Sequence, residues 1–210
     1  MGTRKIVTPI FRASYVSLLE PKETQNGGWC YEITMIFDAE DNLDDLKALF
    51  VEAVQERWKG NPPKTGVGSP FRRGEWKSES YPAGFDLDKY PEYEGKVVVA
   101  ARSYTKKLTN GAFDLSKQPG IVGPDGKGIL DYQRQPLYSG MFGRAEISMY
   151  VPQKGEPRVA VGLHNFQKCY DGESLGGSNG DPEKAFEAFA QPDGAAAGNN
   201  ADLLGVDMGI

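Results

Sequence analysis

Residues 137–151 carry the pattern that decides the fold, and they read Leu-Tyr-Ser-Gly-Met-Phe-Gly-Arg-Ala-Glu-Ile-Ser-Met-Tyr-Val. Apolar residues occupy alternate positions: Met141, Ala145, Ile147 and Met149. The positions between them include aromatic and basic residues: Phe142, Arg144 and Tyr150. Such alternation predicts a β-strand with one buried face and one exposed face. Because Gly140 and Gly143 interrupt the pattern, we expect bulges or a tight bend of the kind found in small barrels.

Further strands are predicted on both sides of this segment. Residues that favour strands run over 8–18, 29–37, 96–104 and 158–170, with a short strand at 121–122. Turn-forming residues separate them at 20–28, 123–126 and 152–157. About five strands with one main helix suit a small closed barrel. The expected fold class is therefore mainly β, an OB-fold-like barrel with long loops.

The main helix is predicted between the second and third of these strands. Its apolar residues recur at helical spacing: Leu43, Leu46, Leu49, Phe50, Ala53, Val54 and Trp58. Asp41 and Asn42 give a start signal, and residues 60–63, Gly-Asn-Pro-Pro, end the helix. A segment rich in Pro, Gly, aromatic and charged residues then runs to residue 95. Loops of this length are usually functional or disordered.

Length and composition predict one main domain with two appendages. The chain has 210 residues, of which 39% are apolar, enough for one sizeable core. We assign residues 1–177 to the OB-fold domain, 178–190 to a short helical segment that opens with Asp181-Pro182, and 191–210 to a disordered tail. No apolar run approaches the roughly 18 residues of a membrane helix, so we expect neither a signal peptide nor a membrane anchor.

Charge is unevenly distributed along the chain. The formal net charge is −5, which taken whole argues weakly against a nucleic-acid partner. From Asp171 onward, eight acidic residues accompany one lysine, which gives this segment −7 and leaves +2 for residues 1–170. We therefore expect the basic body and the acidic tail to attract each other at low salt.

The chain lacks the parts of the common catalytic and metal sites. Its two cysteines, Cys30 and Cys169, and its one histidine, His164, can form neither a disulfide framework nor a tetrahedral zinc set. A Ser/His/acid set is not credible around a single histidine, and no Walker or dinucleotide motif occurs among the 26 glycines. We expect no enzyme activity, no metal and no cofactor, and a reducing, cytoplasmic location.

Basic and aromatic residues are interleaved in several places. Binding of single-stranded DNA (ssDNA) without sequence preference needs cations along the phosphates and aromatic faces for the bases, each stacked base contributing ~1–3 kcal/mol. The candidate phosphate contacts are Arg72, Arg73, Lys77, Arg102, Lys106, Lys107 and Arg144. The candidate stacking residues are Trp76, Tyr81, Tyr104, Phe142 and Tyr150. Any one of these aromatics is more often structural, but Trp76 and Tyr81 lie among polar loop residues, where core packing is a weaker explanation.

Two other classes of protein stay open at this point. An all-β structural or assembly protein of a virion could use the same aromatics for protein contacts, and it predicts stable oligomers without ssDNA binding. A hydrolase would need a divalent metal held by carboxylates. Asp86 and Asp88 form one such group, and Asp41, Asp44 and Asp45 form another, but the second group lies at a helix start, where acids favour the helix dipole.

Between residues 71 and 177 the chain carries a series of short motifs. They are Arg72-Arg-Gly-Glu75, Tyr93-Glu-Gly95, Ala101-Arg-Ser103, Pro119-Gly-Ile-Val122, Leu137-Tyr-Ser-Gly140, Val161-Gly-Leu-His-Asn-Phe-Gln167 and Gly172-Glu-Ser-Leu-Gly-Gly177. In this order and at this spacing, they resemble the phage single-stranded DNA-binding protein family that was first catalogued as a domain of unknown function.

The resemblance implies an OB-fold related to the ssDNA-binding proteins of lytic phage replisomes. It implies sequence-independent binding and protection of ssDNA in phage replication and recombination, in the host cytoplasm and without a cofactor. The expected partners are ssDNA, phage replication proteins docked through the C-terminal tail, and further copies of the protein on DNA, with no membrane.

Members of this family often end in an acidic tail with an aromatic or hydrophobic tip, which competes with DNA for the groove. Here the last nine residues, from Asp202 to Ile210, are apolar at the tip but contain two acids and no Phe. We expect deletion of the residues after Gln191 to raise ssDNA affinity modestly.

Overall fold

The computed structural model describes residues 4–73, 87, 90–129 and 134–175. The described residues form eight strands: β1 (Lys5–Val7), β2 (Phe11–Glu23), β3 (Trp29–Phe37), β4 (Arg72–Arg73), β5 (Val97–Thr105), β6 (Gly120–Val122), β7 (Phe142–Tyr150) and β8 (Ala160–Tyr170). The helical elements are α1 (Asp44–Trp58) and two 3₁₀ turns, η1 (Pro91–Tyr93) and η2 (Leu115–Lys117). Within the described residues, no helix is long and apolar enough to span a membrane.

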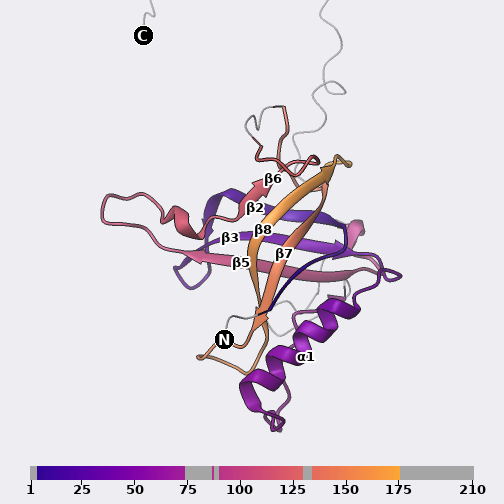
Figure 1. The fold of residues 1–210 in the computed structure, drawn as a ribbon, viewed down its shortest axis with the longest axis vertical. Helices are drawn as coiled ribbons and strands as arrows, with labels where there is room; N and C mark the ends of the chain where they lie inside the picture. The colour runs from indigo at the N-terminus through magenta and orange to yellow at the C-terminus, as the bar shows by residue number, and fades with distance from the viewer. Residues whose placement is uncertain (1–3, 74–86, 88–89, 130–133, 176–210) are drawn as a thin grey trace, which may run out of the picture. The chain divides into compact units, whose positions relative to one another are not determined.

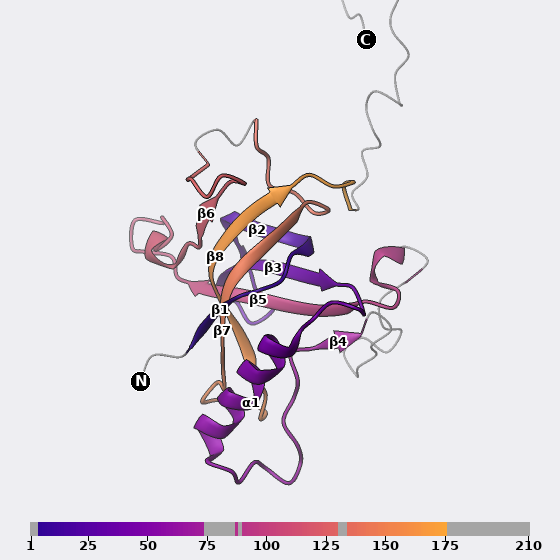
Figure 2. The ribbon, with the colours of Figure 1, turned by 45° about the vertical axis from the view of Figure 1, so that its right-hand side comes forward.

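Five strands close into a barrel in the order β2-β3-β5-β8-β7, and β7 pairs again with β2. All of these pairings are antiparallel except that between β5 and β8. In Figure 1, β7 and β8 cross over the layer formed by β2, β3 and β5. The short strands extend the sheet, with β1 beside β7, β4 beside β5 and β6 beside β8, and Figure 2 shows β1 and β4 in these places. The predicted OB-like barrel is confirmed.

In β7, the alternation of apolar residues in the sequence corresponds to an alternation of buried side chains in the structure. Every apolar alternate residue of the 141–149 segment is buried in the barrel core: Met141, Ala145, Ile147 and Met149. The strand itself begins only at Phe142, because Gly140 lies in the preceding turn with a φ of +114°. Gly143 lies within the strand at a shift of register, and a Cβ there would come within 2.5 Å of the Phe166 ring.

The helix α1 confirms the helical spacing of the apolar residues. Leu46, Leu49 and Ala53 are buried, and the helix packs against β7 at one end of the barrel (Figure 1). Its last residue, Trp58, is followed by Lys59, which caps the helix with a φ of +48°, and by Gly60, whose φ is also positive. The burial of one face of the helix thus closes the core that the barrel strands enclose.

Two details of the strands differ from the sequence-based expectation. Strand β2 continues to Glu23, so the hairpin loop that follows it is shorter than predicted. The long segment after α1 contributes β4 and η1, which no periodicity indicated. The predicted helix at 178–190 and the predicted tail at 191–210 lie outside the described residues, and those domain boundaries stay predictions.

Candidate nucleic-acid interface

One row of residues crosses all five barrel strands on the outer face, the surface turned away from the core. Ser17 of β2 lies opposite Glu32 of β3, which lies opposite Arg102 of β5. Arg102 is in register with Gly162 of β8, which in turn pairs with Ser148 of β7. We call this set the cross-strand row. It joins residues that are far apart in sequence, because the barrel closes β7 and β8 onto β5.

A hollow of about 430 Å³ lies over the β5–β8–β7 part of this row. We call it the tyrosine hollow, and its lining includes Arg102, Tyr104, Ser148, Tyr150, Gly162 and His164. A Cβ at Gly162 would lie 2.9 Å from Ser148 Oγ and 3.6 Å from the Tyr150 ring. The missing side chain therefore keeps the space between the tyrosines open. Tyr104 is 52% exposed, so its ring is accessible to a ligand.

A buried carboxylate holds two basic side chains beside the hollow. The Glu32 side chain is 5% exposed, and its oxygens accept hydrogen bonds from Lys22 Nζ, at 2.5 Å, and from Arg102 Nε. Burial opposes the charge of Arg102, but the Glu32 carboxylate outweighs this and raises the pKa of the guanidinium. Lys22, which lies beside the row, and Arg102 place two cations around one anion, so these three side chains together carry a net positive charge. Charge-assisted hydrogen bonds of this kind also restrict the positions of the basic groups.

His164 lines the tyrosine hollow as a half-buried side chain. Its Nε2 lies 2.8 Å from Ser148 Oγ, within hydrogen-bond distance. Burial is the main cause that lowers the pKa of His164, with the nearby Lys5 acting in the same direction. The imidazole is therefore neutral near pH 7 and adds hydrogen-bonding capacity without charge to the hollow.

The chain itself covers the other half of the outer face. Tyr93 of η1 packs with Ile36 and Val98 in a second apolar cluster, which Leu175 also joins. The Tyr93 hydroxyl lies 2.7 Å from Ser14 Oγ, and burial raises the pKa of Tyr93 to about 12. The half of the face that the described residues leave open is thus the part around the cross-strand row.

Three of the predicted site residues meet in the tyrosine hollow: Arg102, Tyr104 and Tyr150. Two more lie just beyond the end of β5. Lys106 is exposed. Lys107 Nζ lies 4.4 Å from the ring centroid of Trp29, which is a cation–π contact.

The other predicted residues lie elsewhere. Arg72 and Arg73 form β4, in register with Val98 and Val97 at the opposite end of β5 from the hollow. Phe142 stacks on Tyr170, with ring centroids 4.8 Å apart, and Arg144 Nε donates to Gln167 Oε1 at 2.7 Å. Trp76, Lys77 and Tyr81 fall outside the described residues.

Sequence reasoning missed Lys22, Glu32 and Gly162. Lys22 falls in a predicted loop, Glu32 in a predicted strand and Gly162 in one of the family-like motifs, and none of them belongs to a pattern of interleaved basic and aromatic residues. Their role depends on cross-strand pairing. A single sequence contains no signal of which strands become neighbours, so the proximity of these three residues to the predicted site could not be inferred from it.

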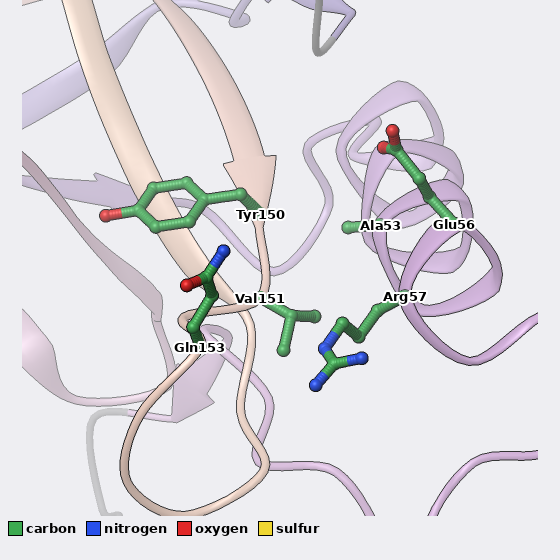
Figure 3. A pocket seen from close by; sticks show the side chains of 6 residues that line it. All are labelled: Ala53, Glu56, Arg57, Tyr150, Val151 and Gln153. Atoms are coloured by element: carbon green, nitrogen blue, oxygen red, sulfur yellow. The ribbon is translucent and has the colours of Figure 1, made fainter. Parts of the chain in front are cut away.

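A second hollow of about 590 Å³ lies between α1 and the end of β7 (Figure 3). It is lined by Ala53, Glu56, Arg57, Tyr150, Val151 and Gln153. Figure 3 shows Arg57 reaching from the helix toward the chain beyond β7. Tyr150 lines both hollows, but Glu56 offsets the charge of Arg57 here. The cross-strand row is therefore the stronger candidate for an anionic ligand.

Among the described residues, no group of three His, Cys, Asp or Glu side chains is arranged to hold a metal ion. Within that part of the chain, nothing supplies the carboxylate cluster that a metal-dependent hydrolase would need.

Comparison with solved structures gives the same fold for this chain. The ssDNA-binding protein of bacteriophage Enc34, solved in complex with ssDNA, is 19% identical with a TM-score of 0.60, over 82% of this chain and 89% of that chain. The T7 protein gp2.5, also an ssDNA-binding protein, is 14% identical with a TM-score of 0.54, over 94% of this chain and 100% of that chain. No curated protein sequence matches the chain.

The family comparison covers most of the sequence. The family model described as the ssDNA-binding protein of Enterobacter phage Enc34 matches residues 4–196. The match spans the whole barrel, with the cross-strand row and the tyrosine hollow. The chain therefore belongs to the Enc34 family of phage ssDNA-binding proteins.

Proposed function

We propose that this protein binds and protects ssDNA without sequence preference during phage DNA replication and recombination in the host cytoplasm. The observation that carries the proposal is the cross-strand row, in which Arg102 lies between a buried carboxylate and the two tyrosines of the hollow. OB barrels bind oligonucleotides on this kind of face, between the strands and the loops beside them. Family membership supports the same function.

In this proposal the tyrosines stack on bases and the basic groups follow the phosphates. Tyr104 and Tyr150 line one hollow, and Arg102, which lies on the same strand as Tyr104, lines it too. A base on a tyrosine therefore brings its phosphate near the guanidinium. Stacking accepts every base, and phosphate contacts carry no sequence information. Binding through these two kinds of contact is therefore independent of sequence, and the proposal includes no catalytic step.

The remaining predicted residues are proposed as DNA contacts outside the tyrosine hollow. Lys106 and Lys107 are proposed contacts beyond β5, and Arg72, Arg73, Trp76, Lys77 and Tyr81 are proposed flanking contacts. Phe142 and Arg144 already have partners within the chain, and we propose that each contributes only weakly to DNA binding. Docking of phage replication proteins through the C-terminal tail and assembly of several copies on DNA also belong to the proposal. Both rest on the family resemblance.

The experiment is fluorescence anisotropy of a labelled oligo-dT, with the full chain, across a range of salt concentrations and with a duplex competitor. We expect tight binding that duplex DNA fails to displace. The logarithm of affinity should fall linearly with the logarithm of salt concentration, by about 0.7 for each phosphate neutralised.

A variant and its control assign the binding to the hollow. Tyr104→Ala should weaken binding about fivefold or more, because one stacked base is lost. Val51→Ala is the control: it shortens another exposed side chain, on α1, and should leave ssDNA affinity unchanged. Absence of ssDNA binding at low salt would overturn the proposal. The alternative of an all-β virion protein would then be favoured, and stable oligomers in solution would support that alternative.

A further inference from the structure

Strand β2 contains a bulge at Tyr15. Ser14 lies opposite Thr34 and Ser17 lies opposite Glu32, so Tyr15 and Val16 together lie opposite Ile33. The backbone of Tyr15 has a φ of +47°. In such bulges the left-handed position is normally glycine, because a Cβ is unfavourable in this conformation.

Tyr15 holds this backbone conformation at the surface of the barrel. Val16, the other residue of the bulge, packs against the main core, whereas Tyr15 remains 47% exposed. Tyr15 shares the left-handed region with one other non-glycine residue among those described, Lys59, which ends α1 as helices commonly do. Residues in strained backbone conformations cluster at functional sites, including positions that contact ligands.

The exposed ring of Tyr15 lies beside Lys22. Lys22 Nζ lies 5.8 Å from its ring centroid, and the same Nζ donates to Glu32. Glu32 in turn accepts from Arg102, which borders the tyrosine hollow. Tyr15 thus stands at one end of a chain of contacts that has Tyr104 and Tyr150 at the other end. The strands β2 and β5, which carry Tyr15 and Tyr104, flank β3 and are about 10 Å apart, two strand spacings.

We propose that Tyr15 is a further base-stacking position of the ssDNA site, presented by the bulge on the far side of Lys22 and Arg102 from the tyrosine hollow. The two basic groups then contact the phosphates between a base on Tyr15 and a base on Tyr104. This inference rests on the proposed function and adds a residue that neither alternation nor composition singled out.

The test uses a substitution that removes the ring and also relieves the backbone. Tyr15→Gly should leave the thermal midpoint unchanged or higher, because glycine accepts the positive φ, while ssDNA affinity falls about fivefold or more. Tyr15→Phe should keep wild-type affinity, since the ring face remains. Lys59→Gly is the matched control, because it relieves the other left-handed residue and should leave affinity unchanged.

Photo-crosslinking gives a second test of the Tyr15 contact, and its result does not depend on the stability of a variant. An oligonucleotide carrying bromodeoxyuridine should photo-crosslink to Tyr15 in the wild-type protein, and peptide mapping should find the adduct there. Wild-type affinity in Tyr15→Gly without a crosslink at Tyr15 would overturn this inference and leave the proposed function intact. Absence of binding by the wild-type protein would overturn both. Loss of self-association in Tyr15→Gly, with unchanged ssDNA affinity, would make Tyr15 a protein contact and also overturn the inference.

Discussion

The two ends of strand β7 place similar residues in different surroundings. At the C-terminal end, Tyr150 borders the tyrosine hollow beside Arg102. At the N-terminal end, Phe142 already stacks on Tyr170, and Arg144 already donates to Gln167. Eight residues separate Phe142 from Tyr150, about 26 Å along the strand. Alternation predicts which side of a strand a residue occupies, but neighbouring strands decide whether its ring face is available.

The largest expected effect compares the two aromatic residues. Tyr150→Ala should reduce ssDNA affinity about 5- to 100-fold, because stacking contributes ~1–3 kcal/mol per base. Phe142→Ala should reduce it less than about threefold and lower the thermal stability instead, since it removes the partner of Tyr170. Anisotropy with oligo-dT and thermal unfolding of both variants measure this difference. Equal losses of affinity would make both ends of β7 part of the DNA path, as alternation alone suggests.

The second comparison concerns the arginines. Arg102→Ala should weaken binding several-fold and reduce the salt dependence by about 0.7, the contribution of one phosphate contact. Arg144→Ala should leave the salt slope close to that of the wild-type protein, since Gln167 already accepts from its Nε. Salt titrations of the three proteins test this. A reduced slope in Arg144→Ala would extend the phosphate path to the far end of β7.

The third comparison uses substitutions at two glycines, one expected to affect mainly stability and the other mainly ssDNA affinity. Gly143→Ala should destabilise the fold by ~1–3 kcal/mol, because its Cβ would lie 2.5 Å from the Phe166 ring and 2.6 Å from a backbone oxygen. Gly162→Ala should cost less stability, since the nearest atom is the Ser148 hydroxyl, which can rotate. It should lower ssDNA affinity moderately by narrowing the tyrosine hollow. Urea unfolding and anisotropy measure the two effects, and a reversal of this order would contradict the placement of the hollow.

The smallest expected effect is the pH dependence contributed by His164. Burial lowers the pKa of His164 below its usual value near 6.5, so the unfolded state binds a proton at a higher pH than the folded state. This contribution to stability is present above pH 6.5 and is lost as the pH falls through the folded pKa. Asp114 and Asp171, whose hydrogen bonds lower their pKa values, lose their contributions only at more acidic pH.

The measurement is urea unfolding of the wild-type protein and of His164→Gln between pH 7.5 and 5.5. The free energy of unfolding should fall with pH more steeply in the wild-type protein. Parallel curves would show that His164 titrates alike in the folded and unfolded states.

Much of the fold could be predicted because strands and helices depend on local periodicity. The alternation in 29–37 and 141–149 and the helical spacing of Leu46, Leu49 and Ala53 correspond to β3, β7 and α1. The ends of β2 and the turn at Gly140 were less predictable. These features depend on hydrogen bonds to distant residues, such as the one from the Gly140 amide to the Ala13 carbonyl.

The sequence by itself determined the barrel class, the buried faces of the strands and the presence of basic and aromatic residues suited to ssDNA. Only the tertiary structure decided which of these residues share a surface. Arg102, Tyr104 and Tyr150 meet because β5, β8 and β7 become neighbours, whereas Phe142 and Arg144 find partners within the chain. The exposure of Tyr15 likewise depends on a bulge in the pairing of β2 with β3. Side-chain alternation is a property of one strand, but a binding surface is a property of the pairing between strands, which closure of the barrel fixes.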